Sequence, residues 1–561
     1  MSLSVASGLF EIQPGADDIT IRGLTLIAGQ EVAIKCGTLD YPPTYNCGAT
    51  NVRIHGCTIR GFGSSGIQID GGRNFTIDSS SVGSTGGTAV YLSGGNRSDL
   101  SAAGHVLVNS TVANFSRTCW SYQPGLALTG VGVTARNNEI SHGPHQAVLW
   151  SGNDMIIDSN VIHDVVLETF DSAAIYASDR DWTMRGTSMI NNLIYGVGNA
   201  STVCNAHTSC ARHAIYLDSL TDGFNVTGNV VVQSDALKAA NANGEAILDN
   251  GGRDNVVNGN MCIGWGLCIS SDDAGLTWYA PGTGDYGNEL RLLKAGLANA
   301  VYTDRYPAMA ALDAFVSLPL LGNCSERESC GPAPWGNTIR GNVAINASTT
   351  PPFDGPRGCV ELPDERQFPG SRFDTQDNRR FNSSAEDLGF VSSDPGTSHC
   401  YALNPSSVLL ACAFRQPLEK VGTTAWRKQW PCKSDDLSLT VLHNASIVDT
   451  TLGSTLSDRY GVEAFCDVSY LSELELREAG ATVVAARELL AAASEQSAGC
   501  SGSPPPHIRY RVTDTIPTLE SLNPPRSSPF RKYLFLNSTT VFAEPPAFAQ
   551  LTFNPPERLG R

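Results

Sequence analysis

The sequence contains no run of 18 apolar residues, so we expect no membrane-spanning helix. Only 17% of its 561 residues are charged, and the formal net charge is −17. Such a chain lacks the basic surface that nucleic acids and anionic membranes require, so neither is expected as a partner. There is no Gly-x-Ser-x-Gly motif, so a serine hydrolase of that type is not indicated. The cysteines show no zinc-type spacing.

Hydrophobic residues make up 41% of the chain, and the 55 glycines indicate many turns in a folded protein. The 16 cysteines include three pairs with one spacing, Cys204/Cys210, Cys262/Cys268 and Cys324/Cys330, which we interpret as loop-closing disulfides. Many Asn-x-Ser/Thr sequons accompany them, so we predict a secreted or cell-surface glycoprotein. The first residues lack a signal sequence, which predicts that the chain starts inside a longer gene product.

A short repeat, apolar-x-apolar-x-Gly/Asn-Asn-x-apolar, decides the fold prediction. Its strongest copies place an asparagine at the same position: Asn138, Asn160, Asn192, Asn229, Asn260 and Asn342. The copies recur at intervals of roughly 22 to 37 residues, with one longer gap. Asparagines at one turn of successive coils can stack as a hydrogen-bonded ladder, which is the structural interpretation we prefer for them.

A second short strand follows each copy, as in 147–151, 174–178, 214–218 and 246–250. Two short strands with alternating apolar residues and a turn in each coil, stacked many times, predict an all-β parallel β-helix. Leucine-rich repeats would need more leucines, and propellers need four strands per blade.

The predicted solenoid covers residues 1–422, with a partly helical insertion at 276–335 that carries Arg-Tyr-Pro. Residues 423–504 are expected to form a small Ala-rich helical appendage, with Cys466 and Cys500 as a candidate disulfide. Residues 505–561 are Pro-rich and are expected to form an extended tail.

The motifs Glu-Thr-Phe-Asp-Ser-Ala-Ala-Ile-Tyr (168–176), Asp-Arg-Asp-Trp-Thr-Met-Arg-Gly-Thr (179–187), His-Ala-Ile-Tyr-Leu-Asp (213–218) and Gly-Gly-Arg-Asp-Asn (251–255) resemble a known family. They are similar to right-handed parallel β-helix proteins of the pectin-lyase-like superfamily, near the secreted β-helical glycoside hydrolases. The resemblance covers about residues 10–422 and implies carbohydrate-related activity. Ser219 stands where that branch usually has a second aspartate.

Strand alternation predicts which side chains face outward. If Ile215 and Leu217 point into the core, then Ala214, Tyr216 and Asp218 point out. Tyr176 lies one coil earlier, so Tyr176, Tyr216 and Asp218 should share one outer patch, with Asp179 and Arg180 at its edge. Tyrosine and tryptophan rings can stack on sugars, and acids and arginines can bind hydroxyls or carboxylates.

We therefore predict a polysaccharide or other glycan as the partner of a monomeric protein. The predicted substrate-binding residues are listed together: Tyr176, Arg180, Trp182, Arg185, His213, Tyr216, Arg253 and Asp254. Trp150 is a further stacking candidate. The structural alternative for the tyrosines is packing at the rim of the sheet.

A glycoside hydrolase is the first hypothesis, and glycoside hydrolysis needs two carboxyl groups. The resemblance favours Asp171 and Asp218, yet a fully extended strand would separate them by on the order of 20 Å. Asp179 with Asp218 is the simpler pair. Asp171, Asp179 and Asp218 therefore form the candidate catalytic set, and turn caps or ion pairs are their alternative roles.

A polysaccharide lyase is the second hypothesis, because Arg180, Arg185, Arg212, Arg253 and His213 could supply a base and a cation for a uronate. No cofactor is predicted; calcium held by aspartates such as Asp218, Asp249 and Asp272 has no diagnostic spacing. His142, His145 and His163 are interpreted as site-edge residues or turn hydrogen-bond partners. A non-catalytic glycan-binding protein is the third hypothesis, which the serine at 219 supports.

Overall fold

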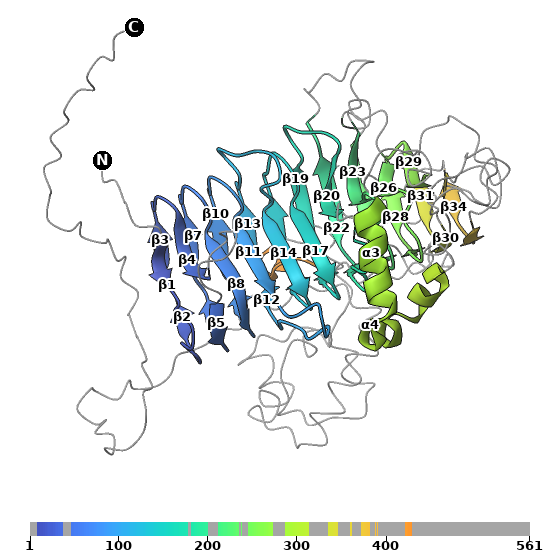
Figure 1. Cartoon of the computed structure of the whole chain (residues 1–561). Coiled ribbons are helices and arrows are strands. Elements are labelled where there is room, and N and C mark those ends of the chain that lie inside the picture. The colour runs from blue at the N-terminus through green and yellow to red at the C-terminus, as the bar shows by residue number, and fades with distance from the viewer. Residues whose placement is uncertain are drawn as a thin grey trace, which may run out of the picture.

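The computed structural model describes residues 8–37, 47–177, 181–199, 211–234, 237, 245–272, 286–313, 335–345, 360–361, 372–381, 388, 390 and 421–428. Within them the chain forms a parallel β-helix, in which three parallel sheets run along the solenoid. Figure 1 shows the strands stacked side by side, from β1 at the blue end to β34 at the yellow end. The predicted fold class is confirmed.

Sheet A contains the longest strands. In spatial order they are β1 (Gly8–Glu11), β4 (Val32–Cys36), β8 (Ile67–Arg73), β11 (Val90–Gly94), β14 (Leu126–Val131), β17 (Val148–Asn153), β20 (Ser172–Ala177), β23 (Arg212–Leu217), β26 (Glu245–Asp249), β29 (Leu267–Ser271) and β32 (Val360–Glu361), with β5 (Cys47–Thr50) beside β8.

Sheets B and C are built mainly from strands of three residues. Sheet B comprises β2 (Thr20–Arg22), β6 (Arg53–His55), β9 (Thr76–Asp78), β12 (Val106–Val108), β15 (Thr134–Arg136), β18 (Ile156–Asp158), β21 (Ser188–Ile190), β24 (Asn225–Thr227), β27 (Val256–Asn258), β30 (Trp335–Arg340) and β33 (Arg372–Gln376). Sheet C comprises β3 (Thr25–Ile27), β7 (Thr58–Arg60), β10 (Ser81–Gly83), β13 (Thr111–Ala113), β16 (Glu139–Ser141), β19 (Val161–Val165), β22 (Leu193–Val197), β25 (Val230–Val232), β28 (Met261–Ile263), β31 (Val343–Ile345) and β34 (Arg379–Phe381).

The turn between sheets B and C explains the sequence repeat. Its first residue has a positive φ, as at Asn137 (54°), Asn191 (56°) and Gly228 (68°), which favours asparagine or glycine. Its second residue points inward and bonds the next coil. The buried amide ladder runs through Asn138, Asn160, Asn192, Asn229, Asn260, Asn342 and Asn378, with steps of 2.9–3.0 Å between side chains. The ladder satisfies buried amides that would otherwise cost free energy.

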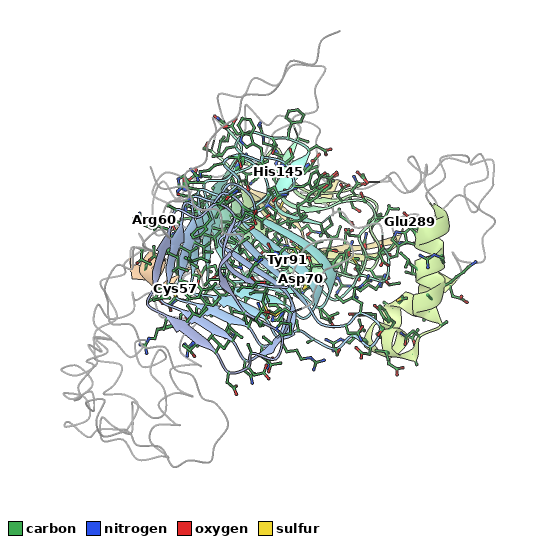
Figure 2. The ribbon with its side chains drawn as sticks, turned by 60° about the vertical axis from the view of Figure 1, so that its left-hand side comes forward. Cys57, Arg60, Asp70, Tyr91, His145 and Glu289 are labelled. Atoms are coloured by element: carbon green, nitrogen blue, oxygen red, sulfur yellow. A yellow bond between two sulfur atoms is a disulfide. The ribbon has the colours of Figure 1, made fainter. Side chains whose placement is uncertain are left out.

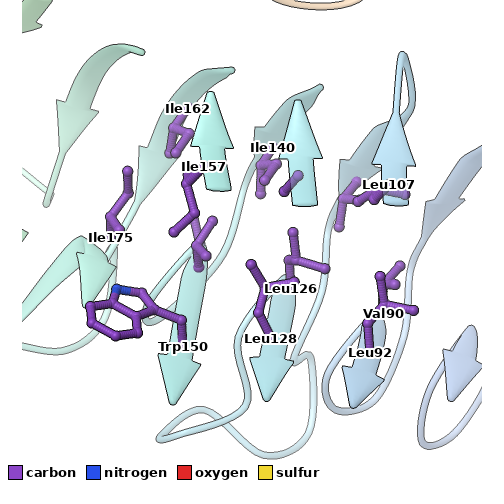
Figure 3. Packing of buried hydrophobic residues seen from close by; sticks show 14 of the residues in the cluster. Val90, Leu92, Leu107, Leu126, Leu128, Ile140, Trp150, Ile157, Ile162 and Ile175 are labelled. Atoms are coloured by element: carbon purple, nitrogen blue, oxygen red, sulfur yellow. The ribbon is translucent and has the colours of Figure 1, made fainter. Parts of the chain in front are cut away.

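The core lies between the three sheets. Figure 3 shows Leu126, Leu128 and Ile175 of sheet A facing Ile157 of sheet B and Ile162 of sheet C. Trp150 is also in this core, 2% exposed, with its ring 4.6 Å from that of Phe224. The expectation that Trp150 stacks on a sugar is therefore wrong in its geometry.

Helices lie outside the solenoid. The described helices α3 (Tyr286–Leu297), α4 (Ala300–Arg305) and η1 (Pro307–Leu312) fall within the predicted insertion, and Figure 1 shows them beside the coils. Their buried side chains form a cluster with Trp182 and Leu220. A short helix, α7 (Thr424–Lys428), follows Val421, which packs with Leu193 of β22. None of the described helices is long and apolar enough to cross a membrane.

Two disulfides are present among the described residues, Cys36–Cys47 and the predicted Cys262–Cys268. The pairs Cys204/Cys210, Cys324/Cys330 and Cys466/Cys500 lie outside the described residues, as does almost all of the predicted appendage and the whole tail. The first disulfide was not predicted, because its cysteines are separated by 11 residues rather than by the common spacing.

Candidate functional site

The register of sheet A aligns outward side chains from four coils. Leu149 pairs with Tyr176, Tyr176 with Tyr216, and Tyr216 with Leu248, and these residues form one apolar cluster on the outer face. The predicted alignment of Tyr176 with Tyr216 is thus present in the structure. Ala214 differs from expectation, because it packs in the inner core next to Ile215. On β23 the residue that faces outward before Tyr216 is therefore His213, which is aligned with Ala173 of the outer cluster.

Asp218 lies at the end of β23, where both tyrosines reach its carboxylate. The Tyr176 hydroxyl donates to Asp218 Oδ2 at 2.7 Å, and the Ser219 amide donates to Oδ1 at 2.7 Å. Tyr216 also hydrogen-bonds Asp218, and its hydroxyl accepts from Asn250 Nδ2 at 3.1 Å. The two tyrosine rings pack edge to face, 5.3 Å apart. Phenols and a carboxylate thus form one ordered network.

Burial raises the pKa of Asp218, and the negative charge of Asp171 raises it further, while the hydrogen bonds from Tyr176 and Ser219 oppose that rise. Burial and the charges of Asp218 and Asp171 likewise raise the pKa of Tyr216. Asp218 thus holds its proton more tightly than an ordinary aspartate does. A carboxyl group of this kind can donate a proton during a reaction.

Asp171 differs from Asp218 in its surroundings. It is exposed, has a φ of 54°, and occupies the turn that leads into β20, where its amide donates to the Ala211 carbonyl at 2.7 Å. Its charge acts on both Asp218 and Tyr216. The two aspartates that the resemblance favours therefore influence the same network of phenols. Asp179 and Arg180 lie outside the described residues.

His213 lies beneath the tyrosines. It is 1% exposed, its ring is 4.8 Å from that of Tyr216, and Nδ1 lies 3.0 Å from the Glu245 carbonyl oxygen and 3.2 Å from its carboxylate. Burial lowers the pKa of His213 to about 4, so the ring is neutral at pH 7 and Nδ1–H is the donor. It is not the cation that the sequence predicted as one alternative. We call Asp171, Tyr176, His213, Tyr216 and Asp218 the outer patch.

Two further aromatic rings lie next to this region: His145, in the turn before β17, and Tyr122, in the turn before β14. The ring of Tyr122 lies 6.4 Å from that of Tyr176 and 5.2 Å from that of His145. Tyr122 is 57% exposed, and nearby in sequence Trp120 is 53% exposed. Sequence reasoning missed Tyr122. The signal for Tyr122 was available, because Trp-x-Tyr precedes a strand of sheet A that lies only two positions from β20.

Four other predicted substrate-binding residues lie elsewhere. Trp182 and Arg253 are fully buried, Arg185 is 2% exposed, and Asp254 belongs to the same cluster. Arg253 donates to Asp222 Oδ1 at 3.1 Å and Oδ2 at 2.7 Å, and its guanidinium lies 4.3 Å from the centre of the Trp182 ring. Arg185 donates twice to Asp254, at 3.1 and 2.8 Å.

We call Arg185, Asp222, Arg253 and Asp254 the ion network. It lies under Trp182, which packs with the residues of α3, α4 and η1. The prediction that Arg253 and Asp254 bind substrate is wrong in its geometry, because Arg253 is buried beneath Trp182 and Asp254 is paired with the buried Arg185. Burial raises the pKa of Asp254 to about 6, even though Arg185 opposes that shift.

Of the aspartates considered for calcium, Asp249 and Asp272 are neighbours, and the Asp272 amide donates to the Asp249 carbonyl at 3.0 Å. Asp249 is fully buried and accepts hydrogen bonds from Gly252, Asn255, Ser271 and Asn337 at 2.9–3.1 Å, and burial raises its pKa to about 7. In the part of the chain that the structure describes, a group of potential metal ligands with their ligand atoms close together is formed by His142, His163 and Asp164.

Figure 2 places other polar side chains on the same fold. Asp70 and Tyr91 lie side by side on sheet A, nearer the N-terminus than the outer patch, and His145 lies at a turn. Burial raises the pKa of both Asp70 and Tyr91. His145 has its Nδ1 2.5 Å from Thr169 Oγ1, and burial lowers its pKa to about 4.

No family model and no curated protein matches this sequence. Three chains of solved structures are similar. One is a PL6 alginate lyase in complex with a trisaccharide, at 14% identity and a TM-score of 0.35, covering 75% of this chain and 96% of that one. Another is the alginate lyase AlyF-OU02 in a complex with G6, at 13% identity and a TM-score of 0.32, covering 74% of this chain and 86% of that one.

The chain itself is a parallel β-helix of three parallel sheets. One fold can host many functions. The chemistry open to this chain therefore depends on the side chains of the outer patch.

Proposed function

We propose that the protein is a glycoside hydrolase that binds a polysaccharide along the outer face of sheet A. The observation that supports this most is the pairing of two aspartates with different surroundings. Asp218 is largely buried with a raised pKa, whereas Asp171 is exposed and acts on it electrostatically. A buried carboxyl group with a raised pKa, next to an exposed second carboxyl group, is suited to the acid role in such a pair.

In this proposal Asp218 is the general acid. Its carboxyl group gives a proton to the glycosidic oxygen as the carbon–oxygen bond breaks, and the departing sugar leaves as an alcohol. Asp171 is the second carboxylate: it takes a proton from a water molecule, whose oxygen forms a bond to the anomeric carbon in place of the departing sugar. Tyr176 positions Asp218 through its 2.7 Å hydrogen bond. Tyr122, which is 57% exposed, provides a ring for sugar contact, whereas the ring of Tyr176 is only 2% exposed.

The charges of the patch favour a neutral glycan over a polyuronate. The described cations that the sequence offered for a uronate are already engaged or uncharged: Arg185 and Arg253 bind aspartates, Arg212 donates to the Thr169 carbonyl, and His213 is neutral. A chain of net charge −17 also repels an acidic polymer.

The test uses Asp218→Asn and Asp171→Asn variants of the full chain on a panel of neutral and acidic polysaccharides. We expect release of reducing ends from a neutral polysaccharide, with kcat/KM reduced by about 10²–10⁴-fold in Asp218→Asn. Asp70→Asn is the matched control, since Asp70 lies on the same sheet face and also has a raised pKa. Full turnover by Asp218→Asn would exclude this site.

One observation favours a lyase as the second candidate. The neutral ring of His213 lies 4.8 Å from that of Tyr216, and such a pair can remove a proton beside a uronate and return one to the leaving oxygen. Elimination leaves an unsaturated product that absorbs near about 235 nm, whereas hydrolysis does not. A product signal there, lost in His213→Gln, would support the lyase over the hydrolase. Binding without any turnover would support a glycan-binding protein instead.

A further inference from the structure

A second cluster of chemically active side chains lies outside the outer patch, on strands β16 and β19 of sheet C and at the residue that follows β16. It consists of His142 and Glu139 from one coil and His163 and Asp164 from the next coil. His142, His163 and Asp164 each offer one ligand atom, and these atoms all lie within 4.8 Å of one another. We propose that these three residues bind a divalent transition-metal ion, with zinc as the probe, and that Glu139 orients His163.

The distances suit such an ion. Asp164 Oδ2 lies 2.8 Å from His163 Nδ1 and 4.0 Å from His142 Nε2. Zinc binds nitrogen and oxygen ligands at about 2.1 Å in tetrahedral sites, which separates two ligand atoms by about 3.4 Å. The observed spacings lie on either side of that value, so modest side-chain rotations bring all three atoms to one ion. Two imidazoles with a carboxylate are a donor set that zinc accepts.

The turn of the solenoid holds two of the ligands in place. His142 and Asp164 occupy equivalent positions on adjacent coils, and both have left-handed backbones, with φ of 58° and 51°. The amide of His142 donates to the His163 carbonyl at 3.4 Å, and that of Gly143 donates to the Asp164 carbonyl at 3.2 Å.

The equivalent position on the next coil is Gly196. A Cβ added to Gly196 would lie 2.8 Å from Asp164 Oδ1, so glycine leaves room for this carboxylate. Stacked coils therefore fix how His142 and Asp164 face each other.

The third ligand is oriented by its neighbours. The ring of His163 stacks on that of Tyr195, with centroids 4.9 Å apart and planes 4° from parallel. Its Nε2 lies 3.4 Å from Glu139 Oε1, which leaves Nδ1 toward Asp164. A ligand histidine whose other nitrogen bonds a carboxylate is the usual arrangement around protein-bound metals. The contact between His163 and Glu139 provides this arrangement.

The carboxylates around His163 and the exposure of the side chains to solvent also suit a bound cation. The carboxylates of Glu139 and Asp164 both lie beside His163, at 3.4 and 2.8 Å, so this point of the surface carries negative charge that attracts a cation. The side chains of His142 and Asp164 are 53% and 48% exposed, which leaves the site open to solvent. The alternative role is a plain ion pair in which a protonated His163 bridges two carboxylates. That role does not require His142 to face the same carboxylate oxygen.

The test is zinc titration of the full chain after treatment with a chelator, at about pH 8, by competition with a chromophoric chelator. Cobalt absorption in the visible range gives an independent readout of nitrogen and oxygen ligation. We expect one zinc site whose affinity falls at least about tenfold in His142→Asn, a change that keeps a residue tolerant of the left-handed backbone. Glu139→Gln should weaken binding by about tenfold, as loss of an outer-shell partner does.

His55→Asn is the matched control, because His55 is also a partly exposed histidine beside a carboxylate, 3.0 Å from Asp78. It should leave zinc affinity unchanged. Wild-type affinity in both His142→Asn and Asp164→Asn, or the absence of zinc binding at micromolar concentrations, would overturn the proposal. Because the ligands lie outside the outer patch, loss of zinc binding and loss of glycan turnover are separate results.

Discussion

The outer patch and the ion network come from the same few coils and contain similar residues, but they differ in how their charges are matched. In the ion network two arginines face two aspartates, and Asp222 and Arg253 are fully buried. In the outer patch Asp218 has two phenols and an amide as partners, and a second carboxylate acts on it. Buried charges that are paired with opposite charges have a structural role, whereas a carboxyl group with a raised pKa at a surface is a candidate catalytic group.

The strongest test of this contrast is Arg253→Met. The change keeps much of the side-chain volume but leaves Asp222 buried with only Arg185, which is 3.6 Å away. Breaking a buried ion pair from one side costs about 3–5 kcal/mol. We expect a lower free energy of unfolding in denaturant titration, with catalytic constants unchanged in the protein that remains folded. An unaltered unfolding midpoint would show that the network does not stabilise the fold.

The converse substitution is Tyr176→Phe in the outer patch. It removes the 2.7 Å hydrogen bond to Asp218 and retains the ring that packs against Tyr216. We expect kcat to fall about tenfold, an effect equivalent to about 1.4 kcal/mol, with little change in Tm. That bond lowers the pKa of Asp218, so its loss should move the alkaline limb of the pH–rate profile to higher pH.

Tyr91→Phe is the control for that variant, since Tyr91 belongs to another strand of the same face, β11. It should leave both kcat and the pH profile unchanged. Equal losses in the two variants would mean that the hydroxyl of Tyr176 has no special role.

Asp254→Asn tests the pH dependence of the ion network. Burial raises the pKa of Asp254 from 3.8 to about 6 in the folded protein. The stabilising contribution of this group is therefore complete below pH 3.8 and is lost as the pH rises through about 6. We expect the Tm of the wild type, relative to the variant, to fall by on the order of 2 °C between those limits. Parallel Tm curves would contradict the assignment.

Much of this fold could be predicted from its sequence, because each coil repeats one local rule. A residue that tolerates positive φ, followed by an inward asparagine, marks each turn from Asn138 to Asn342. Alternation then aligned Tyr176 with Tyr216 correctly. The same alternation failed at Ala214, because the outward residue before Tyr216 is His213.

Prediction of the site was limited by contacts that no local pattern contains. Helix α4 begins at Ala300, far along the chain from Trp182, yet its Tyr302 packs in one cluster with Trp182, whose ring lies 4.3 Å from the Arg253 guanidinium. Nothing in the spacing around Arg185 or Arg253 indicates which distant segment covers them. Polar density along a sequence therefore identifies coils of interest, but burial decides which of their charges can meet a substrate.

We expect the smallest loss in the free energy of unfolding for Arg305→Ala. Arg305 lies 3.2 Å from Asp154, but its side chain is 60% exposed, so water screens the pair. Exposed ion pairs contribute about 0–1 kcal/mol, several times less than the buried pair of Arg253 with Asp222. Denaturant titration of both arginine variants under one set of conditions measures the difference directly. A loss for Arg305→Ala as large as that for Arg253→Met would show that burial is not what separates the two pairs.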